Sequence, residues 1–322
     1  MRRELFTLIF LLGVALVSGC ISQKKGEIPT GNGIIIKDFY FDYSPIYAND
    51  SIGLNLEVQN IGEEKGYVKK VTVFGVDYQS GSSGPLKWGL PADETFILDE
   101  SSPELPVPLA PPDPTTGFEG ESWSYSWTPI APGGIKTPTN FDFQVRVEYN
   151  YSTTYTGTIR VIESSYLKTL TPEERDKLIK EGGVIESTTT GGPMSVSAAS
   201  GRHFIVQQPG TQERTIRFKV TNIGSGYPFD QTLDNTENLY KVRIVDYVGL
   251  KDCDSDFRMS RGKTGTFSCK IEVPGTDTLV NKMDKKFSIT LEYDYYVDSS
   301  TSITVNPVYV GEKLVPGVNL TV

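Results

Sequence analysis

Two stretches of the 322-residue chain, FQVRVEYNYSTTYTGTIRV at 143–161 and FSITLEYDYYVDSSTSITV at 287–305, carry the same pattern 144 residues apart. In both, apolar or aromatic side chains alternate with polar ones, which is typical of a β-strand with one buried face and one face in water. In the first stretch, Val145, Val147 and Tyr149 share the apolar face. The two stretches therefore predict the same long strand in two copies of one module.

Two further pairs of stretches repeat in the same order. LNLEVQNIG at 54–62 returns as IRFKVTNIG at 216–224, and WSYSWTPIAPG at 123–133 returns as GTFSCKIEVPG at 265–275. The spacing differs because a proline-rich stretch in the first copy, residues 98–117, reads as an inserted loop. Short β-rich segments separated by Gly, Pro and Asn turns predict an all-β chain of antiparallel β-sandwiches.

The repeats divide the chain into two domains, residues 33–165 and 192–322, each long enough to bury its own core. Residues 166–191 are predicted to link them and to contain the one clear helix, at 172–181. The stretch LTPEERDKLIKEGG supplies an N-cap threonine, a proline at the first helical position and a capping-box glutamate. We expect this linker to hold the two domains apart rather than fuse them.

The beginning of the chain predicts export. The basic residues of MRRE precede an apolar run from Leu5 to Val17, which is typical of a secretory signal. The run is followed by VSGC, which ends at Cys20 and looks like a lipoprotein signal, in which the cysteine carries the lipid. Residues 1–19 are therefore predicted as a signal peptide and residues 20–32 as a flexible tether. The alternative is an uncleaved anchor with a cysteine placed there by chance.

Charge and cysteine content agree with a location outside the cytoplasm. The formal net charge is −9, and it becomes −10 without residues 1–19, so nucleic acid and anionic headgroups are disfavoured as partners. Cys253 and Cys269 lie sixteen residues apart, and in an exported chain we expect them to form a disulfide. A pair of free thiols is the alternative.

Catalytic and metal-binding chemistry is disfavoured. The only histidine is His203, so a histidine-rich metal site is excluded and a serine or cysteine hydrolase lacks its usual base. The stretch DCDSD at 252–256 begins like a calcium-binding EF-hand loop, but Phe257 stands where that loop needs glycine. An exposed acidic loop is the favoured interpretation. We therefore predict no enzyme activity, metal or cofactor.

The motifs at the strand ends resemble those of the immunoglobulin-like CARDB family, whose modules occur in bacterial and archaeal cell-surface proteins. The first copy carries VQNIG at 58–62 and WTPIAPG at 127–133. The second keeps VTNIG at 220–224 but has Cys269 where the first has Trp127. The resemblance implies immunoglobulin-like sandwiches with a role in display or adhesion, and it brings no catalytic residues. We expect a membrane-anchored surface lipoprotein that binds a protein or glycan partner.

Aromatic side chains suggest an alternative, a carbohydrate-binding accessory module of the cell envelope. Trp88, in SGSSGPLKWG, is predicted to lie in a surface loop, where binding residues concentrate. Trp123, Tyr125 and Trp127 alternate with serines, and such a row can stack sugar rings. Its alignment with the predicted disulfide at Cys269 favours a place in the core instead.

The sequence leaves two questions open: whether its sequons are glycosylated, and what the C-terminal tail pairs with. Asn49, Asn150 and Asn319 begin N-x-S/T sequons, which makes them candidate glycosylation sites in an exported chain. Residues 307–322 follow the last repeated strand and end in VNLTV, in which apolar residues alternate. This tail is able either to pair with its own sheet or to add to the sheet edge of a neighbouring molecule.

Overall fold

The structure is a computed structural model that describes residues 33–180, 183–199, 204–229 and 240–308. The predicted signal peptide, Cys20, the tether, His203, Asn319 and most of the tail lie outside these ranges. The prediction of an all-β chain is confirmed, since strands joined mainly in antiparallel pairs make up most of the described chain. The described helices are α2 (Ser164–Thr169) and α3 (Pro172–Lys180). Thr171 and Glu174 form the expected capping box at the start of α3.

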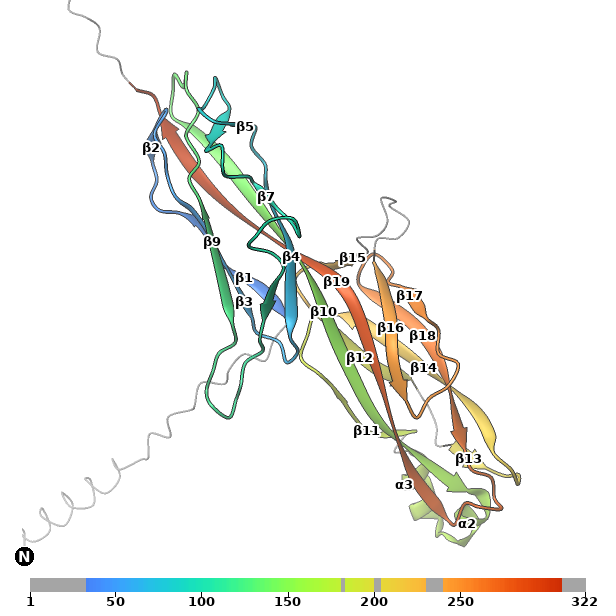
Figure 1. The fold of residues 1–322 in the computed structure, drawn as a ribbon. Coiled ribbons are helices and arrows are strands. Elements are labelled where there is room, and N and C mark those ends of the chain that lie inside the picture. The colour runs from blue at the N-terminus through green and yellow to red at the C-terminus, as the bar shows by residue number, and fades with distance from the viewer. Residues whose placement is uncertain (1–32, 181–182, 200–203, 230–239, 309–322) are drawn as a thin grey trace, which may run out of the picture.

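The two longest strands, β10 (Thr139–Glu163) and β19 (Lys282–Asn306), run through both lobes of the molecule. They pair antiparallel without a register shift over 24 residue pairs, from Thr139↔Val305 to Ile162↔Lys282. At about 3.3 Å per residue this ladder is roughly 80 Å long. Figure 1 shows both strands passing from one lobe of the molecule through a narrow waist into the other.

The two repeated stretches are therefore partners in one ladder. Asn150 and Asp294 are repeat counterparts, 144 residues apart, and they also face each other in the register, so they mark the midpoint of a pseudo-twofold arrangement. The expectation that residues 166–191 hold two separate domains apart is not met. Residues 184–189 of that segment form β11 (Val184–Thr189), which pairs with β10, and the ladder itself joins the lobes. The halves are fused because each long strand contributes to both.

The ladder lies in an eleven-stranded sheet whose main order is β17-β16-β19-β10-β4-β7. We call the lobe that contains β2 and β4 lobe 1, and the lobe that contains β11, β13 and β16 lobe 2. In lobe 1, β4 pairs with β10 and β2 pairs with β19. In lobe 2, β16 pairs with β19, and both β11 and β13 pair with β10. β15 pairs with β19 at the waist. The remaining bounds are β2 (Ile46–Tyr47), β4 (Gly66–Phe74), β7 (Ile97–Leu98), β8 (Val107–Leu109), β13 (Phe204–Val206), β15 (Tyr227–Phe229), β16 (Lys241–Val248) and β17 (Asp256–Arg258).

A three-stranded sheet covers one face of the large sheet in each lobe. Lobe 1 has the order β1-β3-β9 and lobe 2 has the equivalent order β12-β14-β18. Within each lobe, the two sheets contact each other through aromatic rings. The ring centroids lie 5.0 Å apart for Phe41 and Phe143 in lobe 1 and 5.9 Å apart for Phe218 and Phe287 in lobe 2. The strands are β1 (Ile34–Phe41), β3 (Leu54–Asn60), β9 (Ser122–Trp127), β12 (Met194–Ala199), β14 (Gln212–Asn222) and β18 (Thr264–Val273).

The repeated N-x-G motifs fasten strand ends at the waist. The Asn60 amide donates to the carbonyls of Glu64 at 2.8 Å and Leu109 at 2.9 Å, and its oxygen accepts from the Gly62 amide at 3.0 Å. Asn222 makes the equivalent bonds in lobe 2, to the carbonyls of Gly226 and Gly262 and from the Gly224 amide. The motif therefore satisfies backbone groups where a strand turns away from the sheet.

Four buried tyrosines fill the waist on the inner face of the ladder: Tyr149, Tyr151, Tyr293 and Tyr295. They meet across the ladder, with ring centroids 5.6 Å apart for Tyr149 and Tyr295 and 6.4 Å apart for Tyr151 and Tyr293. Burial raises the pKa of all four phenols above its ordinary value of 10. The folded state therefore favours the neutral phenol.

The hydroxyl of Tyr295 joins this cluster to the motif of lobe 2. It donates to the Asn222 side-chain oxygen at 2.8 Å and accepts from the Gly226 amide at 3.0 Å. Its counterpart Tyr151 accepts from the Glu64 amide and donates to the Gly191 carbonyl, each at 3.1 Å. Each lobe is therefore hydrogen-bonded to the ladder through one phenol.

We expect Tyr295→Phe to lower the free energy of unfolding by roughly 1–3 kcal/mol, because it leaves a buried backbone amide without its acceptor. Urea denaturation followed by circular dichroism measures the change. Tyr40→Phe is the matched control, since Tyr40 is half exposed on β1, and it should change stability by less than about 0.5 kcal/mol. Equal losses in both variants would contradict the role assigned to the Tyr295 hydroxyl.

Candidate binding site

Trp88 does not lie in a surface loop, so the sequence prediction of its position is wrong. It stands in β6 (Trp88–Leu90), which pairs with β5 (Tyr78–Ser80), and its side chain is fully buried. Its ring centroid lies 5.0 Å from that of Phe143 and 5.6 Å from that of Phe141. The small residues around Trp88 allow close backbone packing, since a Cβ at Gly89 would lie 2.5 Å from the Ser83 nitrogen. A buried ring offers no face to a ligand.

A hollow of about 590 Å³ instead opens next to Trp88, with Phe141 in its wall. It lies where β4 has ended and β10 continues with β19 on one side. The Phe141 ring is half-buried and packs edge-on against Trp88, at an interplanar angle of 89°. The residues that line the hollow are Gly75, Val76, Asp77, Leu86, Asn140, Phe141 and Asp142.

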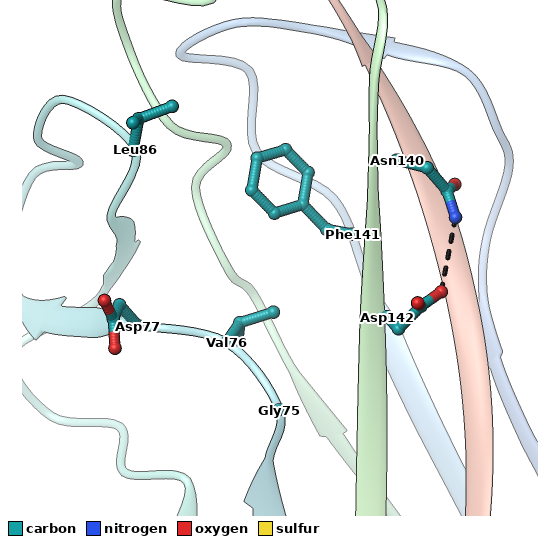
Figure 2. Close-up of a pocket in the computed structure, with 7 residues that line it drawn as sticks. All are labelled: Gly75, Val76, Asp77, Leu86, Asn140, Phe141 and Asp142. Atoms are coloured by element: carbon teal, nitrogen blue, oxygen red, sulfur yellow. Dashed lines mark hydrogen bonds between the residues drawn. The ribbon is translucent and has the colours of Figure 1, made fainter.

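Figure 2 shows how the side chains of this hollow are arranged. Phe141 projects from β10 toward the segments before and after β5 that carry Asp77 and Leu86, whereas Asn140 and Asp142 lie on the other side of the strand. The Asn140 amide donates to the Asp142 carboxylate at 3.2 Å. Leu86 is 64% exposed at the rim, so the hollow has an aromatic wall and an apolar edge.

The charge of the hollow limits what it can bind. Its charged lining residues, Asp77 and Asp142, are both acidic and exposed. Carboxylates and an amide beside an aromatic ring suit a neutral, hydroxyl-rich ligand or a cation, and they disfavour an anion. Sequence reasoning missed Phe141 because it lies just before the repeated stretch, where it reads as one more residue of an alternating strand.

The aromatic row of β9 lies on the core side of its sheet, which is the interpretation that the internal alignment favoured. Trp127 is fully buried, and its indole donates to the Thr95 carbonyl at 2.8 Å. Trp123 and Tyr125 are half-buried and stacked on each other, with centroids 5.8 Å apart. Burial, followed by the carboxylate of Glu104, raises the pKa of Tyr125. Trp123 therefore keeps a partly exposed ring on β9, but it does not line the hollow.

Cys253 and Cys269 lie at disulfide distance and are bonded, as the sequence predicted. The neighbouring carboxylates have protein partners: Asp252 pairs with Lys270 at 2.8 Å, and Asp254 accepts from the Ser268 amide at 2.9 Å. Asp256 pairs with Lys241 at 3.2 Å. Within the described ranges, no group of three or more His, Cys, Asp or Glu side chains is arranged to hold a metal ion.

The two described sequons differ sharply in their surroundings. Asn49 is exposed in a turn, with a φ of 67°, and its side-chain oxygen accepts from the Ser83 hydroxyl. Asn150 is half-buried at the midpoint of the ladder, and its amide donates to the carboxylates of Glu292 and Asp294, each at 3.3 Å. Asn319 lies outside the described residues.

No protein-family model matches the chain, and no curated protein matches it. The chain is similar to a solved protein of unknown function from Porphyromonas gingivalis W83, with 12% identity over 75% of this chain and 84% of that chain and a TM-score of 0.18. It also aligns with collagen adhesin (CNA) from S. aureus, with 8% identity over 87% of this chain and 93% of that chain and a TM-score of 0.09. Similarities at these TM-scores carry no argument about this chain.

The described part of the chain holds no helix that combines the length and the apolar character needed to span a membrane.

If the folded protein is exposed to an N-glycosylation machinery, we expect a glycan on Asn49 and none on Asn150. The Asn49 amide is accessible, whereas the Asn150 amide is engaged between two paired strands. Mass spectrometry of glycopeptides measures occupancy, and Asn49→Gln should remove the signal. A glycan on Asn150 in folded protein would show that the midpoint of the ladder opens.

Proposed function

We propose that this protein is a non-enzymatic surface protein, anchored by lipid on Cys20, whose two halves are CARDB-type immunoglobulin-like sandwiches used for display or adhesion. The signal-like start of the chain supports the anchor. The repeated motifs and the covering of each half of the large sheet by a three-stranded sheet support the sandwiches. The partner under this proposal is a protein or glycan outside the cell.

The unbroken pairing of β10 with β19 is the observation that carries this proposal. Two modules joined by a flexible linker move independently, whereas a ladder of 24 residue pairs through both lobes resists bending at the waist. A stiff rod about 80 Å long presents binding surfaces at fixed positions, which suits display more than chemistry at a cleft.

The described chain begins at the waist rather than at a tip. The Ile61 amide donates to the Gly33 carbonyl at 2.9 Å, and a Cβ at Gly33 would lie 2.9 Å from Pro193 of the other half. Figure 1 shows β1 starting beside the junction of the lobes. A tether over residues 20–32 would reach at most about 45 Å, so the anchor would hold the rod by its middle and leave both tips free.

A carbohydrate-binding function is the second candidate, and the hollow at Phe141 favours it. An aromatic wall, two acidic residues and an amide are the groups that bind sugars in concave sites. This candidate rests on Phe141, whereas Trp123, although partly exposed, does not line the hollow.

For the anchor, we expect the mature chain to begin at an acylated Cys20 and to partition into the detergent phase on Triton X-114 separation. Cys20→Ser should move the protein to the aqueous phase, since one residue carries the lipid. Mass spectrometry of the N-terminal peptide provides the direct readout. An intact, unacylated N-terminus on protein from the cytosol would exclude the proposed anchor.

For the second candidate, we expect a glycan-array signal that falls about tenfold in Phe141→Leu, which keeps an apolar side chain but removes the ring face. Trp123→Leu serves as the matched control and should retain the signal. Thermal unfolding checks that both variants remain folded. Absence of any glycan signal from the native protein would reject the second candidate and leave the first in place.

A further inference from the structure

The two lobes differ in how the outer edge of the large sheet is covered. In lobe 1, β7 and β8 both pair with β4, and both come from the segment that includes the proline-rich insertion 98–117. The Val73 amide donates to the Phe96 carbonyl at 2.8 Å, and Phe96 and Leu98 are buried at 0% and 2% exposure. The insertion and the residues just before it, Phe96 and Ile97, therefore close both the edge and the core beneath it.

In lobe 2, β16 takes the place of β4. Tyr247 faces Ile289 as Val73 faces Val145, so Tyr247 and Val73 are counterparts. β17 pairs only with residues 241–243 of β16, so in the part of the chain that the structure describes no strand pairs with residues 245–248 on their outer side. The Ile244 amide still donates to the Ser255 carbonyl at 2.9 Å, but beyond Ile244 the described chain has no counterpart of the cover that β7 and Phe96 give to β4.

This open edge is apolar. Val245, Tyr247 and Val248 are 50%, 42% and 61% exposed, whereas the counterpart Val73 is 3% exposed. An uncovered edge strand presents unpaired backbone amides and carbonyls to any extended chain, and apolar side chains around it favour such an addition. Residues 245–248 contain no proline or lysine, and the protective features of this edge are the single charge of Asp246 and the register shift between Ile244 and Asp246.

We propose that the open edge of β16 receives an added strand from the tail of a second copy of this protein, residues 307–322. Those residues past 308 lie outside the described ranges, and their sequence ends in VNLTV, where Val318, Leu320 and Val322 alternate with polar residues. That alternation is what a strand needs to cover a half-open core while keeping its other face in water.

The geometry requires a second copy. β19 ends at Asn306 beside β2, at the far end of lobe 1, whereas the open edge lies in lobe 2 (Figure 1). Ile289, which faces Tyr247, is 17 residues before Asn306 in the same strand, a distance of roughly 56 Å. Leu320 lies 14 residues after Asn306 and reaches at most about 50 Å when fully extended. Leu320 of the same molecule therefore stops short of Tyr247, so pairing of these two residues requires a second copy.

Engineered disulfides in the full chain test this inference. We expect purified Tyr247→Cys/Leu320→Cys protein to form a series of disulfide-linked oligomers on oxidation, seen on a non-reducing gel. Val73→Cys/Leu320→Cys is the matched control, because Val73 is the counterpart position beneath a covered edge, and it should stay monomeric. Monomer from both pairs, equal cross-linking by both pairs, or a bond within one molecule would each overturn the inference.

A second measurement does not depend on cysteine geometry. In the native full chain, sedimentation velocity should show concentration-dependent association, which Leu320→Asp should weaken about tenfold or more, since a charge replaces a buried apolar group. Val248→Lys at the receiving edge should have the same effect, with an unchanged melting temperature for dilute monomer. A strictly monomeric native chain at all concentrations would reject the proposal independently of lipidation and of any external partner.

Discussion

The hydrogen-bonded pairing of β10 with β19 is the constraint on which the rest of the structure depends. Each strand gives one half of its length to each lobe, so neither large-sheet layer forms without both strands. Its midpoint holds a buried carboxylate, Asp294, which accepts from Lys69 at 3.2 Å and from Asn150 at 3.3 Å. An unpaired charge there would be costly to bury, so the cluster fixes both the register of the ladder and the approach of β4.

Other residues of the waist are hydrogen-bonded to this ladder on its inner face. The phenols of Tyr151 and Tyr295 connect the turn after each N-x-G motif to the long strands, and Asn60 and Asn222 hold those turns in shape. Since the motifs serve the junction, their repetition reflects a shared mechanical requirement of both halves. A binding role for these asparagines is unnecessary to explain why both copies have them.

Sequence alternation predicted the strand-rich fold, and the spacing of repeated motifs and of the two cysteines predicted the repeat and the disulfide pair, because each depends on local pattern or simple spacing. It did not predict that the repeated strands pair with each other, since two copies of one strand are compatible with separate sheets or with one. The surface placement of Trp88 failed for a different reason. The glycines and serines around it look like a loop, but here they allow tight packing of β5 and β6 over a ring that supports Phe141. A hollow built from three separate segments leaves no signal in any one of them.

The duplication is symmetric in its ladder and asymmetric at its edges, and the asymmetry has one source. Residues 98–117 and their flank cover β4 and fill the core of lobe 1, while β16 in lobe 2 keeps an exposed apolar edge. The hollow lies in lobe 1 and the open edge in lobe 2, on either side of a waist from which the described chain begins. If the chain is tethered there, occupancy of one surface leaves the other accessible, because the stiff ladder keeps them apart. Gain of an insertion in only one copy thus turns two equivalent halves into two different surfaces.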